Sequence, residues 1–227
     1  MKRDTILFDI NETTLDLAPL QSEFISIFGH KSFLQLWFSK LLHLSTVSTI
    51  TKINTTFLEL AKTALEDIAH KNNIEIKSNA IDSLLSKFAT LEPCDDMLPG
   101  LELLKNNNIR TVALSNSSNQ LIESQIKYSG LLGYFDEVIS VEEFGSFKPD
   151  EKVYFSAAKR LKKDVNSLMM VAAHDWDVHG AMSVGMGGAF LNRNSLYYNP
   201  NFIKPDIESD NMISLSKAIL EKKRITI

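Results

Sequence analysis

Short apolar runs recur along the chain, and polar residues follow each of them directly. The first run, Thr5 to Phe8, ends at Asp9, and later runs have the same form. Runs of this length are typical of strands that are buried on both faces of a parallel sheet. The strands predicted from this pattern are residues 5–8, 111–114, 138–140, 168–173 and 188–191.

Helical patterns alternate with these runs. Ser117 and Ser118 are suitable N-caps for one helix, and Pro149 precedes another. The helices predicted here are residues 101–106, 119–128 and 150–162. Alternating strands and helices indicate an α/β fold with a doubly wound parallel sheet. In such sheets ligands bind beyond the carboxyl ends of the strands, so the residues that follow each strand are the candidates for chemistry.

One long segment, residues 17–92, interrupts the alternation. It contains no strand-length apolar run with turn signals on both sides, and it reads as helices, the last of them capped by Ser78. The helices predicted in it are residues 20–28, 32–44, 55–70 and 78–88. The sequence therefore predicts a helical domain, residues 17–92, inserted into an α/β core domain formed by residues 1–16 and 93–227.

Length, charge and cysteine content exclude several classes of protein. The 227 residues suffice for a core with a smaller inserted domain, and a net charge of -4 argues against a general nucleic-acid binder. No apolar run is long enough to span a membrane, and no signal-peptide pattern opens the chain. The single cysteine, Cys94, excludes an internal disulfide, and the acids beside it would raise the pKa of its thiol. We therefore expect a cytoplasmic protein without nucleic-acid or membrane partners.

The residues that follow the strands suit covalent catalysis. They are Asp9, Asn11, Glu12 and Thr13 after the first strand, Ser115 and Asn116 after the second, Lys148 after the third, and His174, Trp176 and Asp177 after the fourth. An ionised and fixed carboxylate can act as a nucleophile, and a lysine nearby lowers the pKa of that carboxyl. Taken alone, Asp9 could cap a turn and Lys148 could be an exposed lysine; their common position at strand ends favours catalysis.

In order and position, these groups resemble the four motifs of the haloacid dehalogenase superfamily. Asp9 and Thr13 match its nucleophile loop, Ser115 matches the second motif, and Lys148 matches the lysine of the third. The likeness covers nearly the whole chain, and the helical insertion stands where many members carry a cap domain. The resemblance implies Asp9 as a covalent nucleophile.

Two positions separate the chain from the Mg²⁺-dependent phosphatases of this superfamily. Those enzymes carry a second aspartate as general acid where this chain has Asn11, and an amide cannot supply that proton. They carry a further aspartate where Ala173 stands, which leaves Asp177 as the acid of the fourth motif. Because a hard cation prefers several oxygen ligands, we expect no metal and no other cofactor.

Other matches resemble the type II (S)-2-haloacid dehalogenases. Lys148 is followed six residues later by Tyr154, Trp176 precedes Asp177, and Asn116 matches an asparagine that can contact halide. The resemblance implies a hydrolase that acts on carbon–halide bonds. It would convert a short L-2-haloacid, a small-molecule substrate, to a 2-hydroxyacid through an ester on Asp9. The resemblance also implies a homodimer.

Two departures from those dehalogenases bear on the mechanism. They have Ser-Ser-Asn where this chain has Ala172-Ala173-His174, and they have a cap arginine thought to bind halide. No arginine lies between Arg3 and Arg110 here, and Phe38 is the expected replacement, since the edge of its ring carries a weak positive charge.

His174 and Glu12 form a further predicted pair, because they follow strands that should be neighbours. A carboxylate partner orients a histidine and raises its basicity, and the chain resembles a small subgroup that activates water with such a pair. Taken alone, Glu12 could be an exposed acid of a loop and His174 could be a structural histidine.

The resulting hypothesis divides the roles in two. Catalysis falls to Asp9, Glu12, Lys148, His174 and Asp177, and the binding of substrate or halide to Asn11, Thr13, Phe38, Ser115, Asn116, Tyr154 and Trp176. Three alternatives stay open: a divergent phosphatase, a protein that keeps the fold without turnover, and hydrolysis of a non-halogenated substrate.

Overall fold

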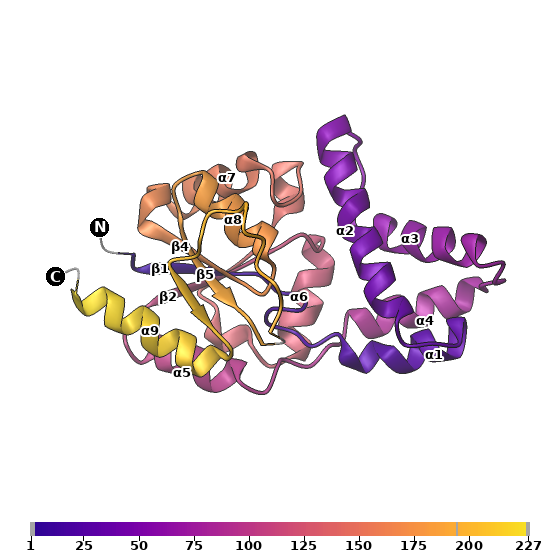
Figure 1. Ribbon diagram of the computed structural model, residues 1–227, viewed down its shortest axis with the longest axis horizontal. Coiled ribbons are helices and arrows are strands. Elements are labelled where there is room, and N and C mark those ends of the chain that lie inside the picture. The colour runs from indigo at the N-terminus through magenta and orange to yellow at the C-terminus, as the bar shows by residue number, and fades with distance from the viewer. Residues whose placement is uncertain (1–2, 194, 226–227) are drawn as a thin grey trace.

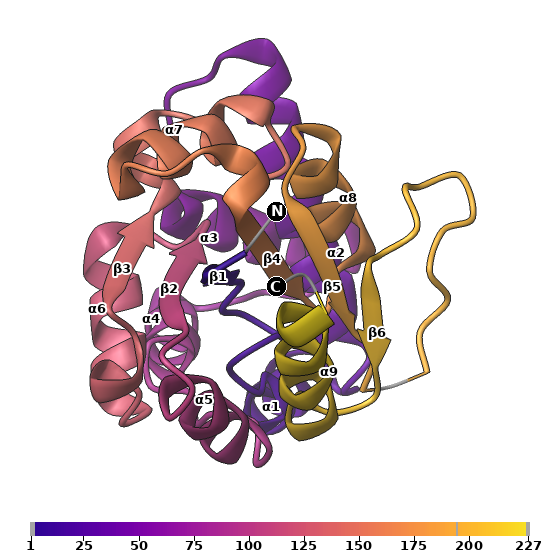
Figure 2. The same cartoon turned by 90° about the vertical axis from the view of Figure 1, so that its left-hand side faces the viewer.

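A six-stranded parallel sheet forms the centre of the protein in the computed structural model, which describes residues 3–193 and 195–225. The strands are β1 (Thr5–Phe8), β2 (Arg110–Ser115), β3 (Glu137–Ser140), β4 (Leu168–Ala172), β5 (Gly187–Leu191) and β6 (Ile207–Ser209). Their order across the sheet is β3-β2-β1-β4-β5-β6, and all neighbouring pairs run parallel (Figure 2). The predicted α/β fold with a parallel sheet is therefore confirmed.

Helices cover both faces of the sheet, which explains the apolar composition of its strands. As drawn in Figure 1, α7 (Glu151–Leu161) and α8 (Asp175–Ser183) lie above the sheet, and α5 (Met97–Lys105) and α9 (Met212–Ile225) lie below it. The helix α6 (Asn119–Tyr128) packs beside β3. Every residue of β1, β4 and β5 is buried, as expected for strands covered on both sides.

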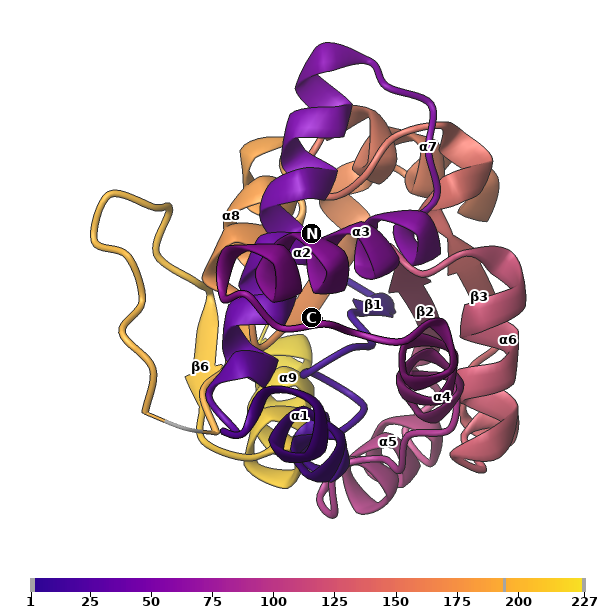
Figure 3. The ribbon, with the colours of Figure 1, turned by 90° about the vertical axis from the view of Figure 1, so that its right-hand side faces the viewer.

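The chain between β1 and α5 forms a separate group of helices. These are α1 (Gln21–Phe28), α2 (Phe33–Thr51), α3 (Phe57–Lys71) and α4 (Ser78–Phe88). They stand beyond the end of the sheet toward which the strands run, with α2 and α3 in front of the strands in Figure 3. Trp37 is fully buried among Phe24, Phe38 and Phe88, and its indole N–H donates to the carbonyl of Ala61 at 2.9 Å. The domain boundaries given above stay predictions.

Short 3₁₀ helices complete the regular structure. They are η1 (Ala18–Leu20), η2 (Leu132–Tyr134), η3 (Val141–Phe144) and η4 (Val165–Ser167). None of the helices in the described part of the chain is long and apolar enough to cross a membrane.

Several local predictions were wrong. The helix α2 continues to Thr51 rather than ending at residue 44, and α5 begins at Met97, because a proline such as Pro99 is tolerated in a first turn, where backbone N–H groups lack helical partners anyway. Ser78 does not cap α4; Lys77 occupies the N-cap position and makes no side-chain cap. The strand β6 was missed, since its three residues, Ile-Glu-Ser, carry one buried apolar side chain.

Candidate active site

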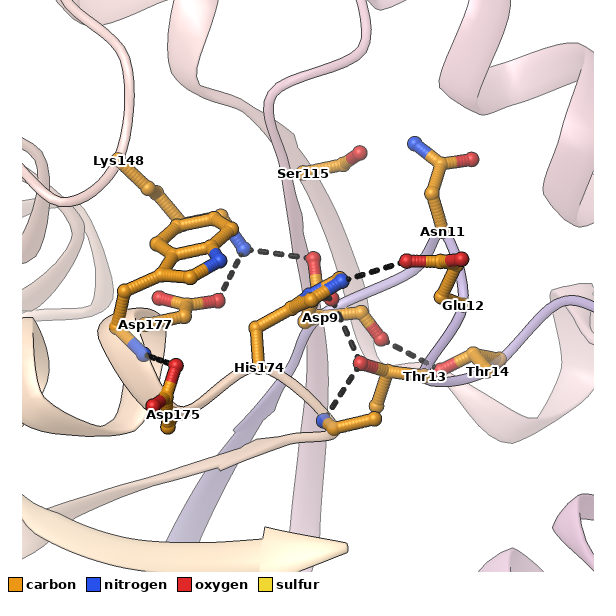
Figure 4. Close-up of polar contacts among 12 residues, drawn as sticks. Asp9, Asn11, Glu12, Thr13, Thr14, Ser115, Lys148, His174, Asp175 and Asp177 are labelled. Carbon is orange, nitrogen blue, oxygen red and sulfur yellow. Dashed lines mark hydrogen bonds and ion pairs between the residues drawn. The ribbon is translucent and has the colours of Figure 1, made fainter. Parts of the chain in front are cut away.

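The loop that follows β1 is held tightly at the carboxyl edge of the sheet. The backbone N–H of Asp9 donates to the carbonyl of Val171 in β4 at 3.0 Å, so the first residue of the loop continues the sheet pairing. The hydroxyl of Thr14 donates to the carbonyl of Asp9 at 2.7 Å, and Glu12 adopts a left-handed backbone with φ 63°. The turn at Glu12 directs its side chain back toward Asp9 and His174 (Figure 4).

Three donors converge on the carboxylate of Asp9, which is 5% exposed. The ammonium of Lys148 donates to Oδ1 at 2.8 Å, the hydroxyl of Thr13 donates to Oδ2 at 2.6 Å, and Nδ1 of His174 lies 3.0 Å from Oδ2 (Figure 4). Burial alone would raise the pKa of Asp9, but the charge of Lys148 and the contact with His174 outweigh it and hold the pKa well below its usual range. Asp9 is therefore a carboxylate at neutral pH.

Lys148 is an ammonium group enclosed by acceptors. Besides Asp9, its Nζ donates to Asp177 Oδ2 at 2.6 Å and to the carbonyl of Leu114 at 3.0 Å. Burial lowers the pKa of Lys148, but the two carboxylates raise it overall, so the charge is retained. In Asp177, burial raises the pKa against the opposing effect of Lys148, and the hydroxyl of Tyr154 donates to its Oδ1 at 2.7 Å. All three protons of this ammonium are used inside the protein.

His174 lies between two carboxylates. Its Nδ1 faces Asp9, and its Nε2 lies 3.0 Å from Oε2 of Glu12. Burial lowers the pKa of His174, but the hydrogen bonds and charges of Asp9 and Glu12 raise it to about 10. The ring is sandwiched between Phe38 of α2 and Trp176, whose ring centroids lie 5.9 and 5.1 Å away.

A small cavity adjoins Asp9. Its volume is about 10 Å³, room for about one water molecule, and its lining consists of Asp9, Asn11, Phe38, Leu42, Phe57, Asn116, His174 and Trp176. A larger cavity of about 460 Å³ shares four of these residues, Phe38, Leu42, His174 and Trp176, and continues outward between α2 and the segment that connects β5 to β6. The aromatic side chains of Phe38 and Trp176 therefore line both cavities, and the larger one lies next to the small cavity at Asp9.

One polar atom in the small cavity lacks a partner. The carbonyl oxygen of the Asn116 side chain accepts the backbone N–H of Lys148 at 2.9 Å, which fixes the amide. No described residue accepts a hydrogen bond from its Nδ2, although that atom is buried. An unpartnered buried donor is costly, so this N–H₂ group is suited to bind a ligand acceptor or an anion.

Three other predicted site residues make hydrogen bonds to neighbouring parts of the protein. Asn11 donates to Ser117 Oγ at 3.1 Å and accepts from Gln125 Nε2 at 3.0 Å, so its amide is engaged although it lines the cavity. The hydroxyl of Ser115 accepts the backbone N–H of Ser117 at 3.1 Å. The hydroxyl of Thr13 donates to Asp9 and accepts the backbone N–H of Ala173 at 2.9 Å, which fixes the hydroxyl beside the Asp9 carboxylate.

Tyr154, predicted to contact the substrate, lies fully buried in α7, and its hydroxyl donates to Asp177 Oδ1 at 2.7 Å. Its role in the substrate pocket stays a prediction. Spacing from Lys148 located this tyrosine near the site, but it could not give the direction of the ring.

Arg193 contacts the site and was missed by sequence reasoning. Its Nη1 donates to the carbonyl of Thr13 at 2.6 Å, and its Nη2 pairs with Asp96 Oδ1 at 2.7 Å. Asp96 also accepts the backbone N–H of Met212 at 2.6 Å. The pair thus joins the nucleophile loop to α9. Its only sequence signal was the position of Arg193 just after the fifth strand.

The donor set does not fit a divalent cation. No group of three or more His, Cys, Asp or Glu side chains within residues 3–193 and 195–225 is placed to hold a metal. Two acids of the site, Asp9 and Asp177, already share the ammonium of Lys148. Cys94 offers no alternative nucleophile, because burial and nearby acids raise the pKa of its thiol to about 11.

Comparison with known proteins identifies relatives of the whole chain. A family model described as haloacid dehalogenase-like hydrolase matches residues 3–185. An (S)-2-haloacid dehalogenase of Pseudomonas sp. (strain YL) is 24% identical over 205 residues, which cover 89% of this chain and 88% of that protein. Haloacetate dehalogenase H-2 of Moraxella sp. (strain B) is 24% identical over 179 residues, 77% of this chain and 80% of that one.

Solved structures share the fold. An L-2-haloacid dehalogenase from Xanthobacter autotrophicus with chloropropionic acid covalently bound superposes with a TM-score of 0.90 at 19% identity, over 97% of this chain and 99% of that chain. A second structure, of an L-2-haloacid dehalogenase from Xanthobacter autotrophicus, gives a TM-score of 0.88 at 20% identity over 97% and 99% of the two chains.

The buried charges around Lys148 give a first testable outcome. In Lys148→Met, Asp177 would stay buried without a counter-charge and Asp9 would keep only that of His174, so we expect the free energy of unfolding at pH 7 to fall by about 3–5 kcal/mol. Urea denaturation measures it, and Lys152→Met, which removes an exposed lysine of α7, is the control. A loss no larger than that of the control would contradict the account of Lys148.

The raised pKa of His174 predicts how stability depends on pH. An unfolded histidine titrates near its ordinary value of about 6.5, whereas folded His174 titrates at about 10. Between these values the folded state holds one more proton, so raising the pH lowers the free energy of unfolding by up to about 1.4 kcal/mol per pH unit. Denaturation at pH 7, 8 and 9 should show this slope in the wild type and in the exposed control His43→Gln, but not in His174→Gln. Equal slopes in all three proteins would disprove the assignment.

Proposed function

Because this chain belongs to the haloacid dehalogenase-like hydrolase family, we propose that it hydrolyses the carbon–halogen bond of short 2-haloacids. The observation that carries the proposal is an ionised Asp9 at the wall of a small, aromatic-lined cavity that also holds the unpartnered amide of Asn116. The dehalogenases among its relatives support the same activity. The proposal includes the L-enantiomer as substrate and turnover without a metal. The homodimer and the cytoplasmic location stay predictions.

In the first step Asp9 attacks the carbon that bears the halogen. Its Oδ1 accepts one hydrogen bond, from Lys148, while Oδ2 accepts the hydrogen bond of Thr13 and faces His174. More electron density is therefore available on Oδ1, which we assign as the nucleophilic atom. The bond from Oδ1 to carbon forms as the carbon–halogen bond breaks, and the halide leaves as an anion that needs no proton.

The residues around the small cavity can contact a short substrate and its leaving group. At about 10 Å³ the cavity has room for about one water, so a 2-haloacid would bind beside Asp9 only with displacement of side chains such as Phe38 or Leu42. The Nδ2 of Asn116 supplies a donor for the departing halide. The rings of Phe38, Phe57 and Trp176 supply apolar contact and keep water away from the reacting carbon.

In the second step water hydrolyses the ester at the carbonyl carbon of Asp9. Thr13 holds Oδ2 and would stabilise the negative charge that develops there. Lys148 lies beside Oδ1, the oxygen that departs as the hydroxyl of the product. The residues that activate the water are His174 and Glu12.

Halide release tests the proposed activity. With racemic 2-chloropropanoate and EDTA, we expect chloride release that stops at half of the racemate. Asp9→Asn should lower the rate by at least about 10⁴-fold, because the nucleophile is lost. The exposed Asp164→Asn is the matched control and should release chloride at the wild-type rate. Hydrolysis of p-nitrophenyl phosphate that appears only with Mg²⁺, without chloride release, would overturn the proposal in favour of a phosphatase.

Isotope labelling tests the covalent route. In a single turnover in H₂¹⁸O the product hydroxyl should carry unlabelled oxygen from Asp9, and one ¹⁸O atom should appear in the peptide that contains Asp9. Mass spectrometry of product and peptide measures both. Label in the product of the first turnover would show direct attack by water and would exclude the ester.

A further inference from the structure

Both ring nitrogens of His174 face carboxylates. Nδ1 lies 3.0 Å from Asp9 Oδ2, and Nε2 lies 3.0 Å from Glu12 Oε2. A neutral imidazole has one N–H, so it can donate to one of these oxygens only, and its other nitrogen would direct a lone pair at the second. An imidazolium donates to both. The geometry therefore selects the doubly protonated ring as long as both partners are carboxylates.

Neither partner carries the proton instead. The hydroxyl of Thr13 and the ammonium of Lys148 already donate to Asp9, which is ionised. The side chain of Glu12 is 37% exposed, so water solvates its carboxylate. The free protein thus holds His174 as a cation, and a cation cannot accept the proton of the hydrolytic water.

Formation of the ester changes one of the two carboxylates that flank His174. When Asp9 is esterified it loses its negative charge, and its Oδ2 becomes the carbonyl oxygen of the ester. We propose, on the basis of the function proposed above, that esterification of Asp9 switches His174 from a cation that holds the nucleophile to the base that activates water. Nδ1 is the nitrogen that loses and regains the proton, and Nε2–H stays on Glu12.

The groups around His174 all favour loss of its Nδ1 proton once the ester has formed. Glu12 alone remains as an anionic partner of the ring after the ester forms. The ammonium of Lys148, now paired only with Asp177, repels a neighbouring cation more strongly than before. Phe38 of α2 and Trp176 of α8 contact the faces of the ring and carry no charge. Asp175 is occupied by the backbone N–H groups of Trp176 and Asn199.

The proton balance closes over one cycle. The first step consumes Asp9 and releases halide; His174 then gives its Nδ1 proton to solvent through the larger cavity, which it lines. The bare Nδ1 takes a proton from water as the hydroxide oxygen bonds to the carbonyl carbon. When the tetrahedral intermediate collapses, Nδ1–H gives that proton to the departing Oδ1. The remaining proton of the attacking water leaves the new carboxylic acid group and restores the imidazolium.

The test is ¹⁵N NMR of the histidine rings in the full-length protein, with Asp9→Asn as a neutral substitute for the ester. His174 is assigned by the signals missing in His174→Gln. In the wild type its ring should stay doubly protonated at pH 8 and titrate near pH 10. In Asp9→Asn the titration midpoint should fall by at least about two pH units, and the neutral ring should carry its proton on Nε2.

Asp175→Asn is the control for the NMR titration. Asp175→Asn removes the adjacent acid that does not contact the ring, and it should leave the midpoint within half of a pH unit of the wild type. Unchanged signals of the other histidines show that each variant is folded. A neutral ring in the wild type at pH 8, or an equal midpoint in Asp9→Asn, would overturn the switch. Failure of the proposed function is a separate result, since it would appear as absent chloride release from the wild type whatever the NMR shows.

Discussion

The arrangement of the site depends on the burial of one ammonium group. Lys148 is 1% exposed and could not stay charged there without the acceptors that surround it, Asp9, Asp177 and the carbonyl of Leu114. These acceptors come from the ends of β1 and β2 and from α8, so one cation fixes three parts of the carboxyl edge of the sheet relative to one another. Tyr154 then satisfies the other oxygen of Asp177. The ion pair with buried Lys148 therefore also holds the carboxylate of Asp9 in place.

The second cation of the site, His174, is held differently. Lys148 is enclosed by two buried carboxylates, whereas His174 has one buried partner, Asp9, and one partly exposed partner, Glu12. The charge of Lys148 can persist through a reaction cycle because Asp177 remains an anion. The charge of His174 depends on Asp9, the group that we propose to react. Lys148 and His174 bind the same carboxylate, but they differ in one respect. The charge of Lys148 persists through the cycle, whereas the charge of His174 depends on whether Asp9 is ionised.

Local sequence patterns predicted the parts of this structure that depend on neighbouring residues. Buried strands read as apolar runs, and the groups that follow them meet because the carboxyl ends of parallel strands share an edge. The pairing of Glu12 with His174 was accessible in this way, since β1 and β4 are neighbours. Contacts between distant segments left no such pattern. The pairs Arg193–Asp96 and Asn11–Gln125 join positions about a hundred residues apart, and the direction of Tyr154 depends on how α7 packs against α8.

The charges that leave the site during the proposed reaction indicate which reactions the site can support. Departure of a halide removes one negative charge from the pocket, and departure of the His174 proton removes one positive charge, so the net charge of the filled site is restored before water attacks. An uncompensated charge in a buried site is costly, which favours this paired loss. A phosphoryl group on Asp9 would have the opposite effect, because it would replace the single negative charge of the carboxylate with nearly two and hold the proton on the ring. In the proposed scheme a neutral ester is the intermediate that makes His174 a base, and the displacement of halide by a carboxylate would produce such an ester.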